Sequence, residues 1–182
     1  NTSSALAVEI VSASTASSSS HQIEISNLAS AHSLVFGGHS SESVAVGTGT
    51  LTFDFGTWTD SSTFSANSSR ESKTITIDST NNTLTGLKDA VNAAAMDVTA
   101  SIIKTSSDSY AIAFKSREGA ANGMRLTTNE SPSASGLANF SFTSVDTSKQ
   151  TLAAADATLK IDGVTAARAS NTITDLIGGL RS

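Results

Sequence analysis

The stretch over residues 73–126 constrains the fold of this chain more than any other part of its sequence. Ile75 and Ile77 alternate with threonine, the pattern of a strand that buries one face. A turn rich in asparagine follows, and Thr83, a residue type that caps helices, then precedes apolar side chains at helical spacing. The pattern predicts a helix over 84–95, followed by paired strands, and therefore a compact unit of strands packed with one helix.

Apolar residues alternate with polar ones in many other short segments, each of which predicts a strand. These segments are 6–11, 21–26, 27–36, 50–55, 98–104, 110–115, 124–127, 140–142, 157–161 and 166–169. Asp162 and Gly163 separate the last two segments, and this dipeptide favours a tight hairpin. We also expect Gly56 to end the strand before it, an irregular or helical connector over 151–155, and a helical turn over 171–177.

The fold class that follows is α+β, predominantly antiparallel β, with two small lobes, one inserted into the other. The first and last strands of the chain are too few to close sheets of their own. We therefore expect residues 1–42 and 151–182 to form a discontinuous β-rich domain. Residues 43–150 would form an inserted β-rich domain, which contains the unit at about 73–127.

Charge and composition exclude several classes of partner. The chain of 182 residues has a net charge of −5, a sequence pI near 5.0 and no cluster of lysine and arginine. Neither a nucleic acid nor a membrane is therefore expected as a partner. The absence of cysteine excludes disulfides, zinc–thiolate sites and thiol nucleophiles. No apolar run approaches the ~20 residues that span a bilayer, and the N-terminal residues lack the pattern of a secretion signal.

The sequence shows no pattern typical of catalysis or of metal binding. His21, His32 and His39 lack the spacing of a zinc site, so we expect them to be exposed or to lie at strand edges. The aspartates lack the alternating spacing of a calcium loop, and no G-x-S-x-G nucleophile motif is present. We therefore expect neither enzymatic activity nor a cofactor.

Two sets of side chains are candidates for contact surfaces. The notable charge cluster consists of Lys115, Arg117, Glu118 and Arg125. These side chains either form a solvated face or contact a neighbouring subunit. A second set is aromatic and consists of Trp58, Phe64, Phe140 and Phe142. In a chain with so few aromatic residues, this set favours the core of a lobe over an exposed recognition patch.

Four blocks of the sequence resemble the filament-capping proteins of bacterial flagella, the hook-associated protein 2 family. They are HQIEISNLASAHSLV (21–35), ITIDSTNNTLTGLKDAVNAA (75–94), VTASIIKTSSDSYAIAFKSREGAANGMRL (98–126) and AAADATLKIDGVTAARASNTITDLIGG (153–179). The second and third blocks are similar to the hook-IN motif, which some flagellins also carry. The fourth block, with its Asp-Ala-x-Leu-x-Ile-Asp-Gly pattern, favours the capping proteins.

The resemblance implies a structural role at the distal tip of the flagellar filament. As a member of this family, the chain would be the central, outward-facing part of a cap that promotes polymerisation of exported flagellin and prevents its loss. Its partners would be flagellin and further copies of itself, and it would reach the cell exterior without a cleaved signal. The alternatives are an outer domain of a flagellin or other hook-IN filament protein, and a tip adhesin that binds host surface glycans.

Overall fold

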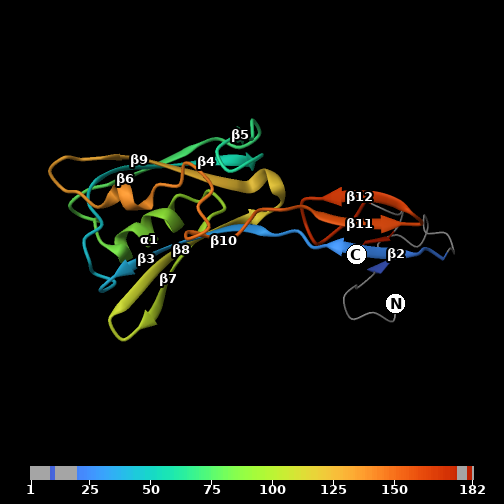
Figure 1. Cartoon of the computed structure of the whole chain (residues 1–182), viewed down its shortest axis with the longest axis horizontal. Helices are drawn as coiled ribbons and strands as arrows, with labels where there is room; N and C mark the ends of the chain where they lie inside the picture. The colour runs from blue at the N-terminus through green and yellow to red at the C-terminus, as the bar shows by residue number, and fades with distance from the viewer. Residues whose placement is uncertain (1–8, 11–19, 176–179, 182) are drawn as a thin grey trace.

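The chain folds into two lobes of unequal size, placed end to end (Figure 1). The computed structural model describes residues 9–10, 20–175 and 180–181. In the described part the strands are antiparallel and α1 (Leu84–Ala93) is the α-helix, which confirms the predicted α+β class. Thr83 caps this helix by accepting a hydrogen bond from the backbone N–H of Gly86 at 3.0 Å, as its residue type predicts.

The larger lobe contains two antiparallel sheets. The first has the strand order β10-β3-β8-β7 and is formed by β10 (Gln150–Leu152), β3 (Ala31–His39), β8 (Ser109–Glu118) and β7 (Thr99–Ser106). In the second, β4 pairs with all three other strands, and its members are β4 (Gly49–Trp58), β5 (Phe64–Ala66), β6 (Lys73–Ile77) and β9 (Gly123–Glu130). The alternation of apolar residues along these strands sends one face of each sheet into a common core.

The core of the larger lobe joins both sheets to the helix. Phe53 of β4 and Phe114 of β8 are fully buried and meet edge to face, with ring centroids 5.5 Å apart. Leu84, Leu87 and Val91 bring the apolar stripe of α1 into the same cluster. Each of these side chains stabilises the fold by roughly 1.5–3 kcal/mol relative to an exposed position.

The smaller lobe is built on a three-stranded sheet of order β12-β11-β2, formed by β12 (Val164–Arg168), β11 (Ala157–Ile161) and β2 (Ile23–Asn27). Asp162 and Gly163 join β11 to β12 with positive φ values of 49° and 87°, which confirms the predicted hairpin. A separate two-stranded pair joins β1 (Glu9–Ile10) to β13 (Leu180–Arg181). The remainder of the strand predicted over 6–11 lies outside the described residues.

Several sequence expectations about individual elements are wrong. Gly56 does not end β4, because the absence of a side chain there admits β5: a Cβ at Gly56 would lie 2.1 Å from the carbonyl oxygen of Ser65. Phe140 ends a short 3-10 helix, η2 (Leu137–Phe140), and Phe142 makes a single bridge to Leu126, so no strand forms there. The two phenylalanines are buried as expected, but a turn rather than a strand presents them to the core.

The two C-terminal expectations also need revision. Residues 151–155 are not merely a connector, because β10 pairs with β3 at the edge of the first sheet. Residues 171–175 are not helical, and the rest of the predicted turn lies outside the described residues. The division into a discontinuous and an inserted domain remains a proposal. The pairing of β3 with β8 assigns residues 31–39 to the sheet of the larger lobe.

Candidate functional site at the joint between the lobes

The predicted charge cluster is divided between two sheets. Lys115 and Arg117 lie exposed on β8, and Nη1 of Arg117 is 3.5 Å from Oδ2 of Asp97. Arg125 lies on β9 and donates from Nε and Nη2 to Oδ2 of Asp54, at 3.1 and 3.0 Å. Arg125 is therefore held by an internal ion pair, whereas Lys115 and Arg117 keep exposed side chains.

Glu118, the fourth member of the cluster, joins the two lobes. Its carboxylate accepts hydrogen bonds from the backbone N–H of Asn171 at 3.2 Å and from Nδ2 of Asn171 at 3.1 Å. The carboxamide of Asn171 also pairs with both backbone groups of Ala29: it accepts from the N–H at 2.7 Å and donates to the C=O at 2.9 Å. The side chain of Asn171 thus connects the end of β8 to the segment that leads from β2 into β3.

Close backbone contact continues this connection beyond Glu118. Gly119 has a φ of +101° and donates its N–H to the carbonyl of Ser30 at 3.2 Å. A Cβ at Gly119 would lie 2.8 Å from the Cβ of Ala169, so a larger residue would push the segments apart. The next N–H, that of Ala120, donates to Oδ1 of Asp156 at 2.7 Å.

Two stretches of chain cross between the lobes at this point, and they are bonded to each other. Ser30 and Ala155 exchange backbone hydrogen bonds of 2.9 and 3.1 Å, and Nδ2 of Asn27 donates to the carbonyl of Asp156 at 2.6 Å. We call this arrangement the joint and define it by Asn27, Ala29, Ser30, Glu118, Gly119, Ala120, Ala155, Asp156, Ala169 and Asn171. Its hydrogen bonds and close contact oppose rotation of one lobe against the other.

The sequence indicated the joint only indirectly. Glu118 was grouped with its charged neighbours, although its partner is 53 positions away. Asn171 begins the segment predicted to form a helical turn, and instead its side chain caps the backbone of Ala29. The signal available in the sequence was the presence of asparagine and aspartate near Gly/Ala segments, since their short polar side chains can bond backbone groups. The distances between those residues along the chain concealed the pairing.

A buried histidine lies next to the joint, contrary to the expectation of exposed or edge histidines. His32 is only 1% exposed because β3 lies between β8 and β10. Its Nδ1 accepts from the N–H of Met124 at 2.8 Å, so the ring proton lies on Nε2, which contacts Oε1 of Gln150 at 3.1 Å. Burial lowers the pKa of His32, which stabilises this neutral form.

The other two histidines contact different residues. His21 in the smaller lobe lies with Nδ1 2.7 Å from Oδ2 of Asp162. His39, at the end of β3, stacks on the ring of Phe140 with centroids 5.5 Å apart. Within the described residues, no three histidine, aspartate or glutamate side chains gather as a metal site would require.

Among the cavities on the described surface of the larger lobe, two are lined by groups that can hydrogen-bond. One, of about 270 Å³, borders the joint and is lined by His32, Thr57, Trp58, Asp60, Ser61, Ala120, Gly123, Val145, Gln150, Ala153 and Ala154. Trp58 donates from Nε1 to the carbonyl of Met124, and Oδ1 of Asp60 accepts from the N–H groups of Ser62 and Thr63. Those bonds lower the pKa of Asp60 to about 2, so its carboxylate holds a turn and is a poor proton donor or acceptor near neutral pH.

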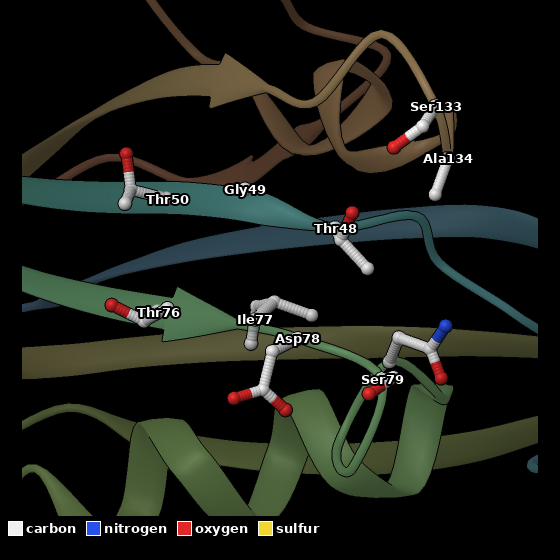
Figure 2. Close-up of a pocket in the computed structure, with 10 residues that line it drawn as sticks. Thr48, Gly49, Thr50, Thr76, Ile77, Asp78, Ser79, Ser133 and Ala134 are labelled. Atoms are coloured by element: carbon white, nitrogen blue, oxygen red, sulfur yellow. The ribbon is translucent and has the colours of Figure 1, made fainter.

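The other cavity, of about 510 Å³, lies where β4 begins and β6 ends (Figure 2). Figure 2 shows the turn at Asp78 and Ser79 on one side of β4 and the loop at Ser133 and Ala134 on the other. Asp78 is its ionisable lining residue, and the hydrogen bonds from the hydroxyl and N–H of Thr80 lower its pKa. The lining offers hydroxyl groups from threonine and serine, which can both donate and accept hydrogen bonds.

Solved structures of flagellar cap proteins resemble this chain over nearly its whole length. The D2-D3 domains of the flagellar cap protein FliD from Serratia marcescens match with a TM-score of 0.81 and 24% identity, covering 97% of this chain and 90% of that one. The D2-D3 domains of FliD from Escherichia coli match with a TM-score of 0.78 and 24% identity, covering 99% and 88%. No family model and no curated protein matches the sequence.

A longer structure sets the extent of the match. The D1-D2-D3 domains of FliD from Escherichia coli match with a TM-score of 0.78 and 25% identity over 99% of this chain, which spans 51% of that structure. The chain therefore has the fold of the D2-D3 domains of flagellar cap proteins, and the resemblance seen in the sequence is confirmed. The alternatives of a flagellin outer domain and a glycan-binding adhesin gain no support from these structures. None of the described helices has the length and apolar character needed to cross a bilayer.

Proposed function

We propose that this chain is the outward-facing part of a cap at the distal tip of a bacterial flagellar filament, outside the cell. The observation that carries the proposal is the match of both lobes together to the D2-D3 domains of FliD from Serratia marcescens, over 97% of this chain and 90% of that structure. A match to one lobe alone would support only a similar fold for that lobe. The arrangement of two lobes on one joint is a more specific feature.

The proposed role is mechanical and needs no catalytic group. Copies of the protein would cover the filament end, hold exported flagellin there and promote its insertion beneath the cap. The joint supports such a role, since it fixes the angle between the lobes with hydrogen bonds through Asn171 and Asp156. Each of these bonds contributes about 1 kcal/mol. A few together favour one angle between the lobes, but a binding partner could still shift the lobes to another angle.

Part of the predicted charge cluster is available for contact with neighbouring subunits. Lys115 and Arg117 keep exposed side chains, whereas Glu118 and Arg125 are engaged within the chain. We therefore assign the proposed subunit contact to Lys115 and Arg117. Rim charges of this kind act mainly on the rate and orientation of association, and salt weakens them.

Deletion of the gene that encodes this chain tests the proposal. Loss of a cap should leave filaments short or absent, abolish swimming and release flagellin monomer into the medium, where it can be measured by immunoblot. Reintroducing the intact gene should restore all three. Filaments of normal length with no soluble flagellin in the medium would contradict the proposal.

A further inference from the structure

The outer edge of β7 is an open strand edge. Among the described strands, β7 is the last of its sheet and pairs with β8 alone (Figure 1). Its side chains are largely exposed, and Ile103 is 45% exposed, one of few large apolar residues on the described surface. Soluble proteins usually protect such edges, because the unpaired backbone groups can bind another strand.

The hydrogen bonds of Asn92 identify the backbone groups that face outward. From α1, its Nδ2 donates to the carbonyl of Ala100 at 2.9 Å, and its Oδ1 accepts from the N–H of Ala100 at 2.8 Å. The backbone groups of Ala100 therefore point away from β8. Because this direction alternates along an antiparallel strand, those of Ile102 and Lys104 point outward too, and no described side chain hydrogen-bonds to them.

Lys104 is the only charged residue of β7, and a lysine on an edge commonly discourages pairing. Here the side chain leans back over the sheet, with Nζ 5.5 Å from the ring centroid of Tyr110 on β8. The ammonium group is thereby drawn away from the open edge. The backbone groups of Lys104 stay accessible.

We propose that β7 pairs antiparallel with β7 of a second copy of this chain, with Ile103 on the two-fold axis. The two-fold axis could lie at Ile103 or at either neighbour, Ile102 or Lys104. In each of these three registers, outward-facing residues of one copy lie opposite outward-facing residues of the other. A centre at Ile102 would pair Lys104 with Ala100, whose groups Asn92 already occupies. A centre at Lys104 would place two ammonium-bearing residues directly opposite, which is unfavourable.

The remaining register gives a complementary contact. Ile102 of each copy exchanges two backbone hydrogen bonds with Lys104 of the other, and the two Ile103 side chains lie opposite each other, with Cα atoms about 4.5 Å apart. The regular alternation of β7 ends after Lys104, where a bulge shifts its register against β8, so Ile102, Ile103 and Lys104 form the centre of the contact. The result is a continuous eight-stranded sheet across two copies, because each contributes four strands.

The net charge of the chain and the small area of the contact determine the conditions under which two copies pair. The chain has a net charge of −5, so two copies repel over most of their surface, but β7 itself contains no acidic residue and the nearest carboxylates along the chain, Asp97 and Asp108, lie beyond its two ends. Two short strand edges bury less than the roughly 1,200 Å² typical of stable complexes. The dimer is therefore weak and is populated at high local concentration, as in an assembly. This inference goes beyond the proposed function and does not depend on it.

Single cysteine variants test the register, since the natural chain has no cysteine. Under mild oxidation of the concentrated protein, Ile103→Cys should form a disulfide-linked dimer, because the opposed Cα atoms lie within disulfide range. Ser101→Cys alone should not, because this register places residue 101 of the two copies four positions apart. Val164→Cys, on an exposed residue of the other lobe, reports random collision. No excess of dimer for Ile103→Cys over Val164→Cys, or a dimer from Ser101→Cys alone, would overturn the proposal.

A proline variant tests the backbone bonds without the covalent trap. Lys104→Pro removes an outward N–H that β8 does not use, so the fold should persist by circular dichroism. Two hydrogen bonds are lost per dimer, and sedimentation equilibrium should show association weakened about tenfold or more. Lys104→Ala, the matched control, keeps the N–H and should associate at least as well as the natural chain. Equal association of the proline and alanine variants would overturn the proposal as well.

Discussion

The neutral state of His32 makes the stability of the larger lobe depend on pH. In the folded chain, burial lowers the pKa of His32 below the ordinary value of about 6.5. As the pH falls below 6.5, the unfolded chain therefore binds a proton before the folded chain does, and unfolding becomes easier. The contribution of neutral His32 is fully present above pH 6.5 and is lost progressively below it, until the folded pKa is reached.

The structure explains why the folded chain resists this proton. A proton on Nδ1 would face the N–H of Met124, which that nitrogen now accepts at 2.8 Å, and no charged side chain contributes to the lowered pKa. The contribution of His32 to the free energy of unfolding should therefore fall by up to about 1.4 kcal/mol per pH unit, and by at most about 2 kcal/mol in total between pH 6.5 and 5. The carboxylates with lowered pKa values, such as Asp60, lose their contributions to stability at lower pH, below the range in which His32 and His39 act.

Urea unfolding at pH 7, 6 and 5 measures the effect, followed by the fluorescence of Trp58, which lines the same cavity as His32. His32→Gln keeps a hydrogen-bonding side chain without the titration, so its stability should fall less steeply than that of the natural chain as the pH decreases from 7 to 5. His39→Gln is a second matched variant: burial also lowers the pKa of His39, so this substitution should remove a separate part of the pH dependence. Equal pH slopes for the natural chain and His32→Gln would refute the reasoning.

Three substitutions test the local arguments by urea or thermal unfolding. Thr83→Ala removes the cap of α1 and should cost about 1 kcal/mol, whereas Thr83→Ser should cost little. Gly119→Ala places a side chain at φ +101° against the smaller lobe and should cost about 2 kcal/mol or more; an unchanged unfolding temperature would contradict the tight joint. Asn171→Asp loses the donor to Ala29 and faces the carboxylate of Glu118, so it should destabilise the joint more at pH 7 than at pH 4, seen as faster amide exchange at Ala29.

Local patterns in the sequence predicted the fold class and most of the elements. The alternation over Ile75 and Ile77, the cap at Thr83 and the Asp162–Gly163 hairpin all depend on residues within a few positions of each other. Such signals are reliable because the backbone conformation and the buried face are set locally. The failure at Gly56 has the opposite cause: its role depends on the close approach of β5, which no local pattern encodes.

The candidate site was less accessible from the sequence than the fold. The charged residues of β8 and β9 are close in the chain, yet the partners that matter lie far away: Asn171 for Glu118 and Asp54 for Arg125. The burial of His32 likewise depends on β10, which pairs with β3 across more than a hundred positions. Long-range pairing, rather than residue type, decides which polar groups are engaged and which remain free to contact a partner.

Labelling the protein on living cells tests the central claim most directly. Val164 is 70% exposed and the natural chain has no cysteine, so Val164→Cys in the intact gene product accepts a maleimide dye without competing sites in this chain. Fluorescence microscopy of swimming cells should then show one focus at the distal end of each filament. Label spread along the filaments would indicate a flagellin outer domain, and label confined to the cell body would place the protein away from the filament. Either result would contradict a cap.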